Sequence, residues 1–375
     1  MRIAFIVHDY HKTGGHSRYV YELAMRFAAE HDVHVFANKI QGRDPRIKYH
    51  YVPALRFNAL ASVLTFILPA TLLRLKRFDI VHAQGLCGLR QNVVTAHMCQ
   101  TAWYRAQEKY MGALTLKQKI FRALVQPIEK YIFQSRRSKA VIAVSRRVKD
   151  DLRECYGRAN GVTVIHHGVD LKAFTPENRF HWRVHTRTAL GMSNDKFMAL
   201  YVGDLQKGAL PAIEAISRVE AARLVCVSPS NPEPYKVFAE KMGVTNRVHF
   251  VPRSDCIERY YAAADVFLFP TFYDTFGMVI SEAMASGLPV ITSALAGASE
   301  LIDHEINGVL VADPWDAKAL TAWLERLKSD IALRDNMGVE ARRKIEHYSW
   351  DDTAAETMRV YRDVLDAKQS PGSPR

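Results

Sequence analysis

Residues 267–287 read FLFPTFYDTFGMVISEAMASG, and this stretch decides the fold class. The apolar run at 266–269 is typical of a buried parallel strand, which Pro270 ends. A polar loop containing Asp274 follows, and apolar residues at helical spacing then lead to Gly287, a typical helix C-terminus. A strand, a polar loop and a helix in this order predict an α/β domain that binds a ligand at the carboxyl ends of its strands.

Two acids in this stretch, Asp274 and Glu282, are candidate ligand contacts. If one helix carried both, they would lie about 12 Å apart along its axis, too far to act as a carboxylate pair. They could instead hold the two ends of an elongated ligand. Between them, the amides of Phe276, Gly277 and Met278 would open the helix and attract an anion. A capping acid followed by an ordinary exposed glutamate explains the same residues equally well.

The sequence PTFYDTFGMVISEAMASGLPVITS at 270–293 resembles the nucleotide-sugar signature of the retaining glycosyltransferases of family 4, also called glycosyltransferase group 1. That signature is an acid, seven residues, a Glu and then A-M-A-x-G-x-P-V. The similarity continues through GASELIDHEINGVLVADPWDAKAL at 297–320 and, more weakly, over nearly the whole chain. The resemblance implies the GT-B fold, an α/β fold with two Rossmann-like doubly wound domains facing each other across a crevice.

The resemblance also implies roles for these residues. Glu282 would hold the ribose hydroxyls of the donor, and Asp274 would contact the sugar ring together with the backbone from Phe276 through Gly277 and Met278 to Val279. Asp274 departs from the family, which usually has Glu at this position.

Composition limits the partners and the compartment. A chain of 375 residues is long enough for two domains, and its formal charge of +12 favours an acidic partner. Nucleotide phosphates and an anionic membrane surface both fit, whereas we find no recognition motif for nucleic acid and expect none to bind. The five cysteines show no metal-ligand spacing, so we expect a reducing compartment, no metal and no cofactor. The N-terminal apolar run is too short for a signal peptide, which favours a cytoplasmic protein.

The N-terminus repeats the strand, glycine loop and helix pattern. A strand at 3–7 leads through Gly14-Gly15 into a helix, without the GxGxxG dinucleotide fingerprint. The G-G-x-x-R form with Arg18 is similar to lipopolysaccharide-core enzymes, and the resemblance implies that Gly14, Gly15 and Arg18 meet the donor phosphates or the acceptor. A plain tight turn is the alternative.

His97 ends an expected strand at 93–97. A lone histidine is more often structural. The resemblance to the family's T-x-H motif implies an acceptor-site residue near the reacting carbon. Met98 stands where the family usually has Asp.

Two segments of the first half suggest contact with a membrane surface. Residues 59–75 are strongly apolar but contain Pro69, so we expect a helix packed in the core and keep open partial contact with a membrane interface. Residues 103–149 are basic with interleaved aromatics, which favours docking on anionic lipid over a simple solvated face.

The second half opens with a strand at 198–203 and a loop at 204–208 that carries Lys207. A lysine there would neutralise the charge that grows on a leaving diphosphate. The family has both Arg and Lys in this loop, and this chain keeps Lys207 alone. Arg253 follows the strand at 248–251, where the family contacts the base; a surface arginine explains it equally well.

These observations predict four parts: an acceptor-binding domain at 1–170, a nucleotide-sugar domain at 171–350, a closing helix at 351–368 and a disordered tail at 369–375. They predict a metal-independent glycosyltransferase that moves a sugar, expected as a UDP sugar, to a cell-envelope glycan or glycolipid such as lipopolysaccharide core. We expect it to sit peripherally on the inner face of the cytoplasmic membrane. The oligomeric state is left open. The alternatives are a weakened nucleotide-sugar-binding or membrane-docking protein, and a GT-B epimerase or phosphorylase.

Overall fold

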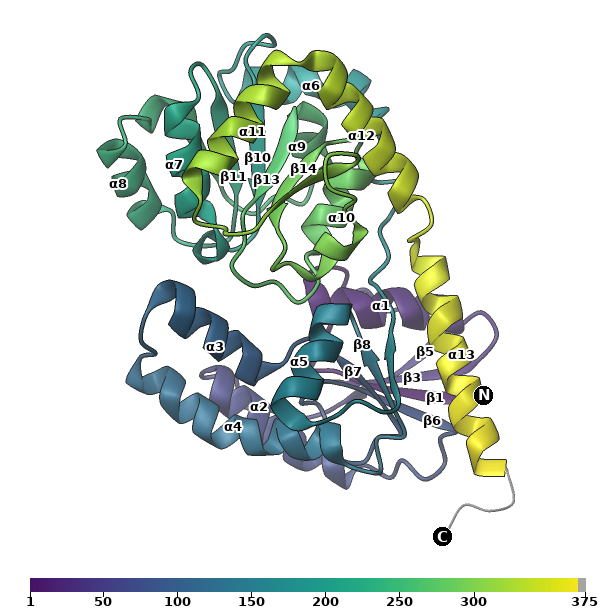
Figure 1. Ribbon diagram of the computed structural model, residues 1–375. Helices are drawn as coiled ribbons and strands as arrows, with labels where there is room; N and C mark the ends of the chain where they lie inside the picture. Colours follow the sequence, from purple (N-terminus) through teal and green to yellow (C-terminus); the bar gives the residue numbers. More distant parts are fainter. Residues whose placement is uncertain (370–375) are drawn as a thin grey trace. The chain divides into compact units, whose positions relative to one another are not determined.

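The computed structural model describes residues 1–369 and divides the chain into two compact units. The first unit contains residues 1–168 and the C-terminal segment from Trp350, and the second contains residues 169–349. These limits lie within two residues of the domain boundaries expected at 170 and 350. Residues 370–375, in the expected tail, lie outside the described residues. Figure 1 shows a sheet inside each unit with helices around it.

The first unit is built on a parallel sheet of seven strands. Its order is β5 (Ile47–Tyr51), β3 (Asp32–Ala37), β1 (Arg2–Ile6), β6 (Ile80–Gln84), β7 (Val93–Ala96), β8 (Ala140–Ala143) and β9 (Val162–Val164). The central strands are buried on both faces because helices cover the sheet, as their continuous apolar runs predict. The strand order changes direction between β1 and β6, so the loops after these strands diverge and leave room for a ligand.

Six long helices surround this sheet: α1 (Gly15–Phe27), α2 (Ala59–Leu72), α3 (Gln100–Met111), α4 (Leu116–Gln134), α5 (Arg146–Tyr156) and α13 (Trp350–Gln369). The last of them, α13, lies beside α1 although most of the chain separates them (Figure 1). The Tyr361 hydroxyl lies 2.6 Å from Nδ1 of the buried His82, and Arg26 pairs with Asp351 at 2.5 Å. The C-terminal helix therefore completes the first unit.

The apolar segment at 59–75 forms α2, which has two different faces. Phe66 and Ala70 are buried in a core cluster with β1, β3 and β6, which confirms the expected core packing. Leu68 and Leu72, on the opposite side, are exposed by 69% and 76%. Within residues 1–369, no helix is long and apolar enough to cross a membrane.

The second unit has a parallel sheet of six strands in the order β12 (Val248–Val251), β11 (Arg223–Val227), β10 (Met198–Val202), β13 (Val266–Phe269), β14 (Val290–Ser293) and β15 (Gly308–Val311). The order changes direction between β10 and β13. Its main helices are α6 (Asn178–Ala189), α7 (Ala209–Arg218), α8 (Glu233–Lys241), α9 (Glu258–Ala263), α10 (Met278–Ala285), α11 (Ala317–Ser329) and α12 (Ile331–Ile345). Both units are thus doubly wound α/β domains, as predicted.

The structure adds elements that the sequence patterns did not predict. The strands β5 and β15 close one edge of each sheet, and β2 (Asp9–Tyr10) pairs with β4 (Lys39–Ile40) outside the main sheet. The helix α10 begins at Met278, so Asp274 lies in the preceding loop, as the sequence predicted. The spacing calculated for a continuous helix therefore does not apply to Asp274 and Glu282.

Candidate active site

Two loops meet at the point in the second unit where the strand order changes direction. One follows β10 and contains the short 3-10 helix η1 (Leu205–Lys207), and the other follows β13. The Phe272 N–H donates to the Lys207 carbonyl at 3.1 Å. A Cβ on Gly208 would lie 2.3 Å from the Pro270 carbonyl oxygen, so only glycine permits this approach. The backbone therefore fixes Lys207 beside the loop that carries Asp274.

Lys207 and Asp274 form an ion pair at this point. Nζ of Lys207 lies 2.7 Å from Oδ2 of Asp274, and Lys207 remains partly accessible, with 29% of its side chain exposed. Burial works against the ammonium, but the Asp274 carboxylate outweighs it and raises the pKa of Lys207. Lys207 is therefore a permanent cation at the carboxyl edge of the sheet.

The loop around Asp274 is held on several sides. Oδ1 of Asp274 accepts from the Phe276 amide at 3.3 Å, and the Asp274 backbone carbonyl accepts from the Gly297 N–H at 2.8 Å. The Phe276 amide, expected to point at a ligand, is therefore engaged by Asp274. Gly277 adopts φ 90° as the N-cap residue of α10, so the amides of Gly277, Met278 and Val279 have no preceding helical carbonyl.

Glu282 lies in the middle of α10 and is 7% exposed. One of its carboxylate oxygens accepts from the Tyr261 hydroxyl at 3.1 Å. A buried acid held by a tyrosine differs from the exposed helical glutamate that the sequence left open. Its fixed position suits recognition of hydroxyl groups, which can donate to a carboxylate.

A hollow of about 740 Å³ lies beside the Lys207 loop, at the carboxyl ends of β11 and β12. Its wall includes Leu205, Ser230, Asn231, Phe250 and Arg253. Ser230 Oγ donates to Asp204 at 3.0 Å, which ties this wall to the Lys207 loop. Arg253 is thus placed at a concave site, although it follows β12 on an exposed turn.

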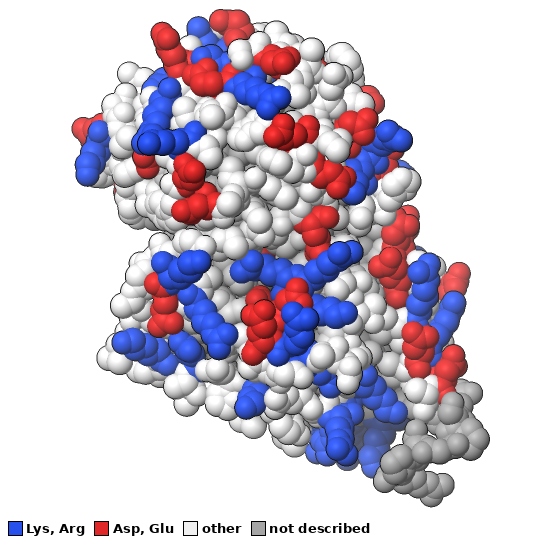
Figure 2. Space-filling model, in the orientation of Figure 1, with Lys and Arg blue, Asp and Glu red and all other residues white. Residues whose placement is uncertain are grey.

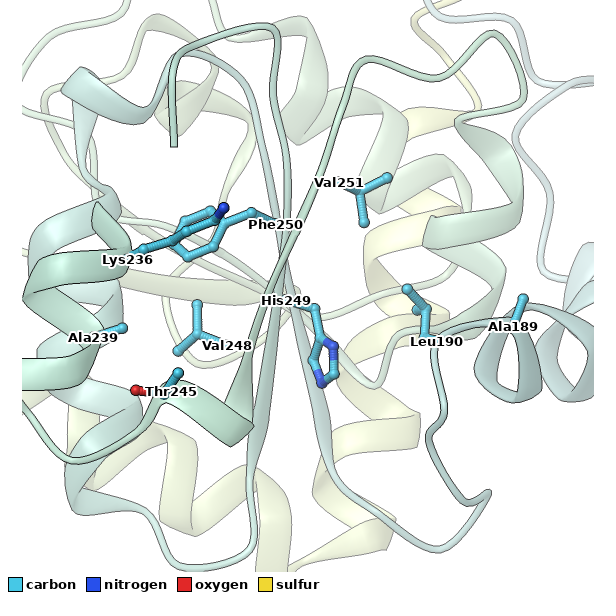
Figure 3. Close-up of a pocket in the computed structure, with 9 residues that line it drawn as sticks. All are labelled: Ala189, Leu190, Lys236, Ala239, Thr245, Val248, His249, Phe250 and Val251. Carbon is cyan, nitrogen blue, oxygen red and sulfur yellow. The ribbon is translucent and has the colours of Figure 1, made fainter. Parts of the chain in front are cut away.

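A second hollow, of about 420 Å³, straddles the outer edge strand β12 (Figure 3). Val248 and Phe250 lie on the side of Lys236 and Ala239, and His249 lies on the side of Leu190. Burial lowers the pKa of His249. This hollow contains none of the predicted site residues.

The glycine loop of the first unit opens α1, as predicted. Gly14 has φ 83° and precedes the first residue, Gly15. The Arg18 guanidinium lies over the Trp350 ring at 5.8 Å and near Glu22 at 3.9 Å. Arg18 is therefore oriented by neighbours of its own unit.

His97 follows β7 and is 3% exposed. Its Nε2 lies 2.8 Å from Oε1 of Gln84, and its ring lies 4.2 Å from the His16 ring. Burial, with the neighbouring His16, His167 and His82, lowers the pKa of His97 well below its usual value. The structure thus brings His97 next to the N-terminus of α1, as a neutral imidazole.

We searched the described residues for metal sites. Between residues 1 and 369, no group of three or more His, Cys, Asp or Glu side chains is arranged to hold a metal ion.

Comparison with known families covers both units. Residues 13–173 match the family described as Glycosyltransferase Family 4, and residues 196–330 match the one described as Glycosyl transferases group 1. This chain belongs to the family 4 glycosyltransferases. The match to the second family spans Lys207, Arg253, Asp274 and Glu282, and the match to the first spans Gly14, Arg18 and His97.

Curated relatives of this family 4 chain match over part of their length. An uncharacterised glycosyltransferase of Methanocaldococcus jannaschii is 31% identical over 236 residues, covering 60% of this chain and 60% of that protein. A D-inositol 3-phosphate glycosyltransferase of Xylanimonas cellulosilytica is 32% identical over 240 residues, covering 60% of this chain and 57% of that protein. The chain therefore spans three fifths or less of the length of these relatives.

Solved structures confirm the GT-B fold of this family 4 chain. WaaG, a glycosyltransferase involved in lipopolysaccharide biosynthesis, has a TM-score of 0.80 at 22% identity, covering 96% of this chain and 99% of WaaG. HepE of Anabaena, in complex with UDP and glucose, has a TM-score of 0.72 at 18% identity, covering 97% and 100%.

Three contributors to the sites of this family 4 chain were not predicted. The loop after β11 supplies the wall opposite Arg253, Tyr261 holds Glu282, and His16 packs on His97. The loop after β11 has no glycine and Tyr261 lies in α9, so neither carries a local pattern. His16, in contrast, directly follows the predicted glycine loop and was within reach of the sequence.

Proposed function

We propose that the protein transfers a glycosyl group from a nucleotide diphosphate sugar to a hydroxyl acceptor. The observation that carries this proposal is the Lys207–Asp274 pair at the carboxyl edge of the second sheet, 2.7 Å long and fixed by two backbone contacts. A cation and a carboxylate held together here suit a substrate with a diphosphate at one end and sugar hydroxyls at the other.

In the proposed complex, each part of the donor has its own contact. The diphosphate lies against Lys207 and the first-turn amides of α10, both of which attract anions. The ribose hydroxyls bind Glu282, and the base enters the hollow beside Arg253, whose guanidinium can cover its face. UDP is the nucleotide we favour, since HepE, which shares the fold, is crystallised with UDP.

The chemistry follows from where charge develops. As the glycosidic bond to the diphosphate breaks, negative charge grows on the leaving phosphate, and Lys207 stabilises it. None of the described side chains is placed as an evident nucleophile, so we propose same-face displacement with retention, in which the leaving phosphate assists the acceptor hydroxyl. Lys207 and the α10 amides supply the neutralising charge in place of a metal, and the sequence has no Asp-x-Asp motif.

The first unit is the proposed acceptor domain. His97, next to the Gly14-Gly15 turn and His16, offers a neutral imidazole that can orient the acceptor hydroxyl, whose proton passes to the leaving phosphate. We propose a cell-envelope glycan or glycolipid as acceptor, with lipopolysaccharide core as the leading example.

A lipid-linked acceptor would bring the protein to a membrane surface. The helix α4 has the exposed apolar and basic side chains that such docking would use. Leu116, Ile120, Leu124 and Tyr131 form a partly exposed apolar stripe at helical spacing, flanked by exposed Lys117 and Lys119. Figure 2 shows Lys and Arg side chains spread over the region of α3 to α5, mixed with acidic ones. We propose peripheral docking on the cytoplasmic face of an anionic membrane through this stripe.

Two other functions use the same site. The first is a protein that binds the donor without turnover, which one observation favours: the Asp274 carboxylate, the proposed contact of the sugar ring, is engaged by Lys207. A GT-B epimerase or phosphorylase would use the donor pocket but give a free sugar or a sugar phosphate as product.

The test is a product assay with UDP-glucose, UDP-N-acetylglucosamine and GDP-mannose, using membrane glycolipid extracts as acceptor and mass spectrometry as readout. A glycosylated lipid, formed by the wild type and absent with Lys207→Ala, is the expected result. Nucleotide-sugar binding without any glycosylated product would overturn the proposal, and a sugar phosphate as product would favour the phosphorylase.

A further inference from the structure

A third hollow in the second unit lies at the amino ends of the strands, whereas Lys207 lies at their carboxyl ends. It measures about 440 Å³ and includes Phe197, which precedes β10, and Asp265, which precedes β13. Lys207 and Asp274 follow the carboxyl ends of these same two strands. A five-residue strand is about 16 Å long, so the hollow is a separate site and no part of the donor pocket.

The hollow has an excess of cationic side chains. Four line it, Arg183, Lys196, Lys328 and Arg334, whereas only two carboxylates do, Asp195 and Asp265. They come from α6, the loop before β10, α11 and α12, so the fold gathers them from four separate segments.

The buried carboxylate, Asp265, is fully engaged. One oxygen accepts from Arg179 at 3.1 Å and Arg183 at 2.8 Å, and the other accepts from Arg187 at 2.7 Å and from the Met198 amide. Three guanidinium groups therefore share a single negative charge. Burial, together with the charges of Arg179 and Arg187, lowers the pKa of Arg183 to about 10 despite Asp265. The cluster therefore keeps a net positive charge, although its other N–H groups donate to backbone carbonyls such as those of Ala263 and Ala264.

The other three cations have weak acidic partners, and Arg334 also donates to the Leu327 carbonyl at 3.4 Å. Lys196 lies 3.4 Å from Asp195, Lys328 lies 3.2 Å from Glu325, and Arg334 lies 3.7 Å from Asp335. Each partner is a near neighbour in sequence whose side chain is 43% exposed or more, and such pairs hold a cation weakly. Lys196 and Lys328 can therefore turn to a ligand at little cost, whereas Arg334, with 14% of its side chain exposed, is already held at the hollow by Leu327 and Phe197.

We propose that this hollow binds a small phosphate-bearing anion, with Lys328 and Arg334 as its main contacts. A guanidinium and an ammonium converging on one site match the tetrahedral oxygens of a phosphate group. The volume is large enough for a diphosphate or a sugar phosphate. Because the hollow lies at the amino ends of β10 and β13, an anion bound there is separate from the donor at Lys207.

The test is calorimetric titration of the full chain with inorganic pyrophosphate at low ionic strength. Pyrophosphate can also bind at Lys207, so the titration is run on wild type, on Lys207→Ala, and on Lys207→Ala combined with Lys328→Gln and Arg334→Gln. We expect one site to remain in Lys207→Ala, and its affinity to fall about tenfold or more in the triple variant. Lys207→Ala with Lys318→Gln, an exposed lysine of α11, is the matched control and should bind like Lys207→Ala.

A second measurement needs no variant of the hollow. Hydrogen exchange of the unaltered protein with pyrophosphate should show protection at 194–197 and 328–334. A hexose 6-phosphate is titrated in parallel to identify the kind of anion. If it binds more tightly than pyrophosphate, the ligand is a sugar phosphate. If the two bind equally, the site recognises the phosphate group alone. Loss of all pyrophosphate binding in Lys207→Ala, equal affinity in the triple variant, or no protection at these segments would overturn the proposal.

Discussion

Nζ of Lys207 lies 2.7 Å from Oδ2 of Asp274, so the cation that we assign to the donor diphosphate is paired with a carboxylate of the protein. The pair orients Lys207 but also competes with a phosphate for it. Donor binding must therefore share or replace the Asp274 contact, and the two residues are expected to respond differently to mutation.

Lys207→Ala should weaken binding of a nucleotide diphosphate about tenfold or more, because a charge-assisted contact is lost and the Asp274 carboxylate is left facing the phosphates. Asp274→Asn should leave the affinity unchanged or raise it, because Lys207 is released, while turnover falls. Calorimetry and steady-state kinetics measure the two effects. A larger loss of affinity in Asp274→Asn would contradict these roles.

Gly208→Ala should destabilise the second unit by about 2 kcal/mol or more and weaken donor binding, because the added Cβ would meet the Pro270 carbonyl at 2.3 Å. Gly15→Ala is the control for stability, since nothing lies within 4 Å of its Cβ position and its φ is not left-handed. Thermal unfolding is the measurement. Equal melting temperatures for the two variants would show that the loop contact is unimportant.

Glu129 should make stability depend on pH. It accepts from the Gln100 amide at 3.0 Å, and its burial raises its pKa to about 7. The folded pKa lies above the unfolded value, so the protonated form stabilises the fold at low pH. This stability, on the order of 3 kcal/mol, is lost as the pH rises from about 4 through 7.

Glu129→Gln should remove that dependence, so the variant gains stability relative to wild type between pH 5 and pH 8. Chemical denaturation at both values measures it. Glu108→Gln, at an exposed position of α3 in the same unit, should behave like wild type. If the free energies of unfolding of Glu129→Gln and wild type differed by the same amount at both pH values, Glu129 would not be the source of the pH dependence.

His97 should stay neutral throughout the working pH range, because burial and its histidine neighbours hold its pKa well below 6.5. The pH profile of kcat/KM above pH 6 should therefore have the same shape in wild type and His97→Gln, although the variant is slower. A limb between pH 6 and 7 that disappears in the variant would show that His97 titrates there.

Replacing Leu116, Ile120 and Leu124 with Gln should abolish most binding to vesicles containing anionic lipid, because the apolar stripe of α4 is removed while its lysines remain. Val237→Gln with Val339→Gln, both exposed apolar positions of the second unit, is the control. Co-sedimentation with anionic and neutral vesicles gives the result. Equal binding by both variants would exclude the stripe as the docking surface.

The sequence predicted the parts of the fold that rest on local patterns. The apolar run at 266–269 gave a strand with the observed limits, because a strand buried on both faces needs no polar residue. The edge strand β5, IKYHY, was missed because its mixed composition lacks that pattern and it forms by pairing with β3. The glycine loops were placed correctly, since backbone close to a neighbour requires glycine at Gly208.

The candidate site was predictable in its members but not in their partners. The signature pointed to Asp274 and Glu282, and the strand and loop pattern pointed to Lys207. That Lys207 binds Asp274, 67 residues away, depends on the change of strand order between β10 and β13, which the sequence does not display locally. The contact between Tyr261 and Glu282, and the meeting of four segments around the cationic hollow, likewise depend on the tertiary fold and not on a local sequence pattern.

Titration of the wild type and of Lys207→Ala with UDP, GDP and ADP tests the central claim most directly. The account predicts that one diphosphate nucleotide binds the wild type, that UDP is the leading candidate, and that Lys207→Ala loses tenfold or more in affinity. If none of the three binds, or if one binds both proteins equally well, the carboxyl edge beside Lys207 and Asp274 is not a nucleotide-sugar site.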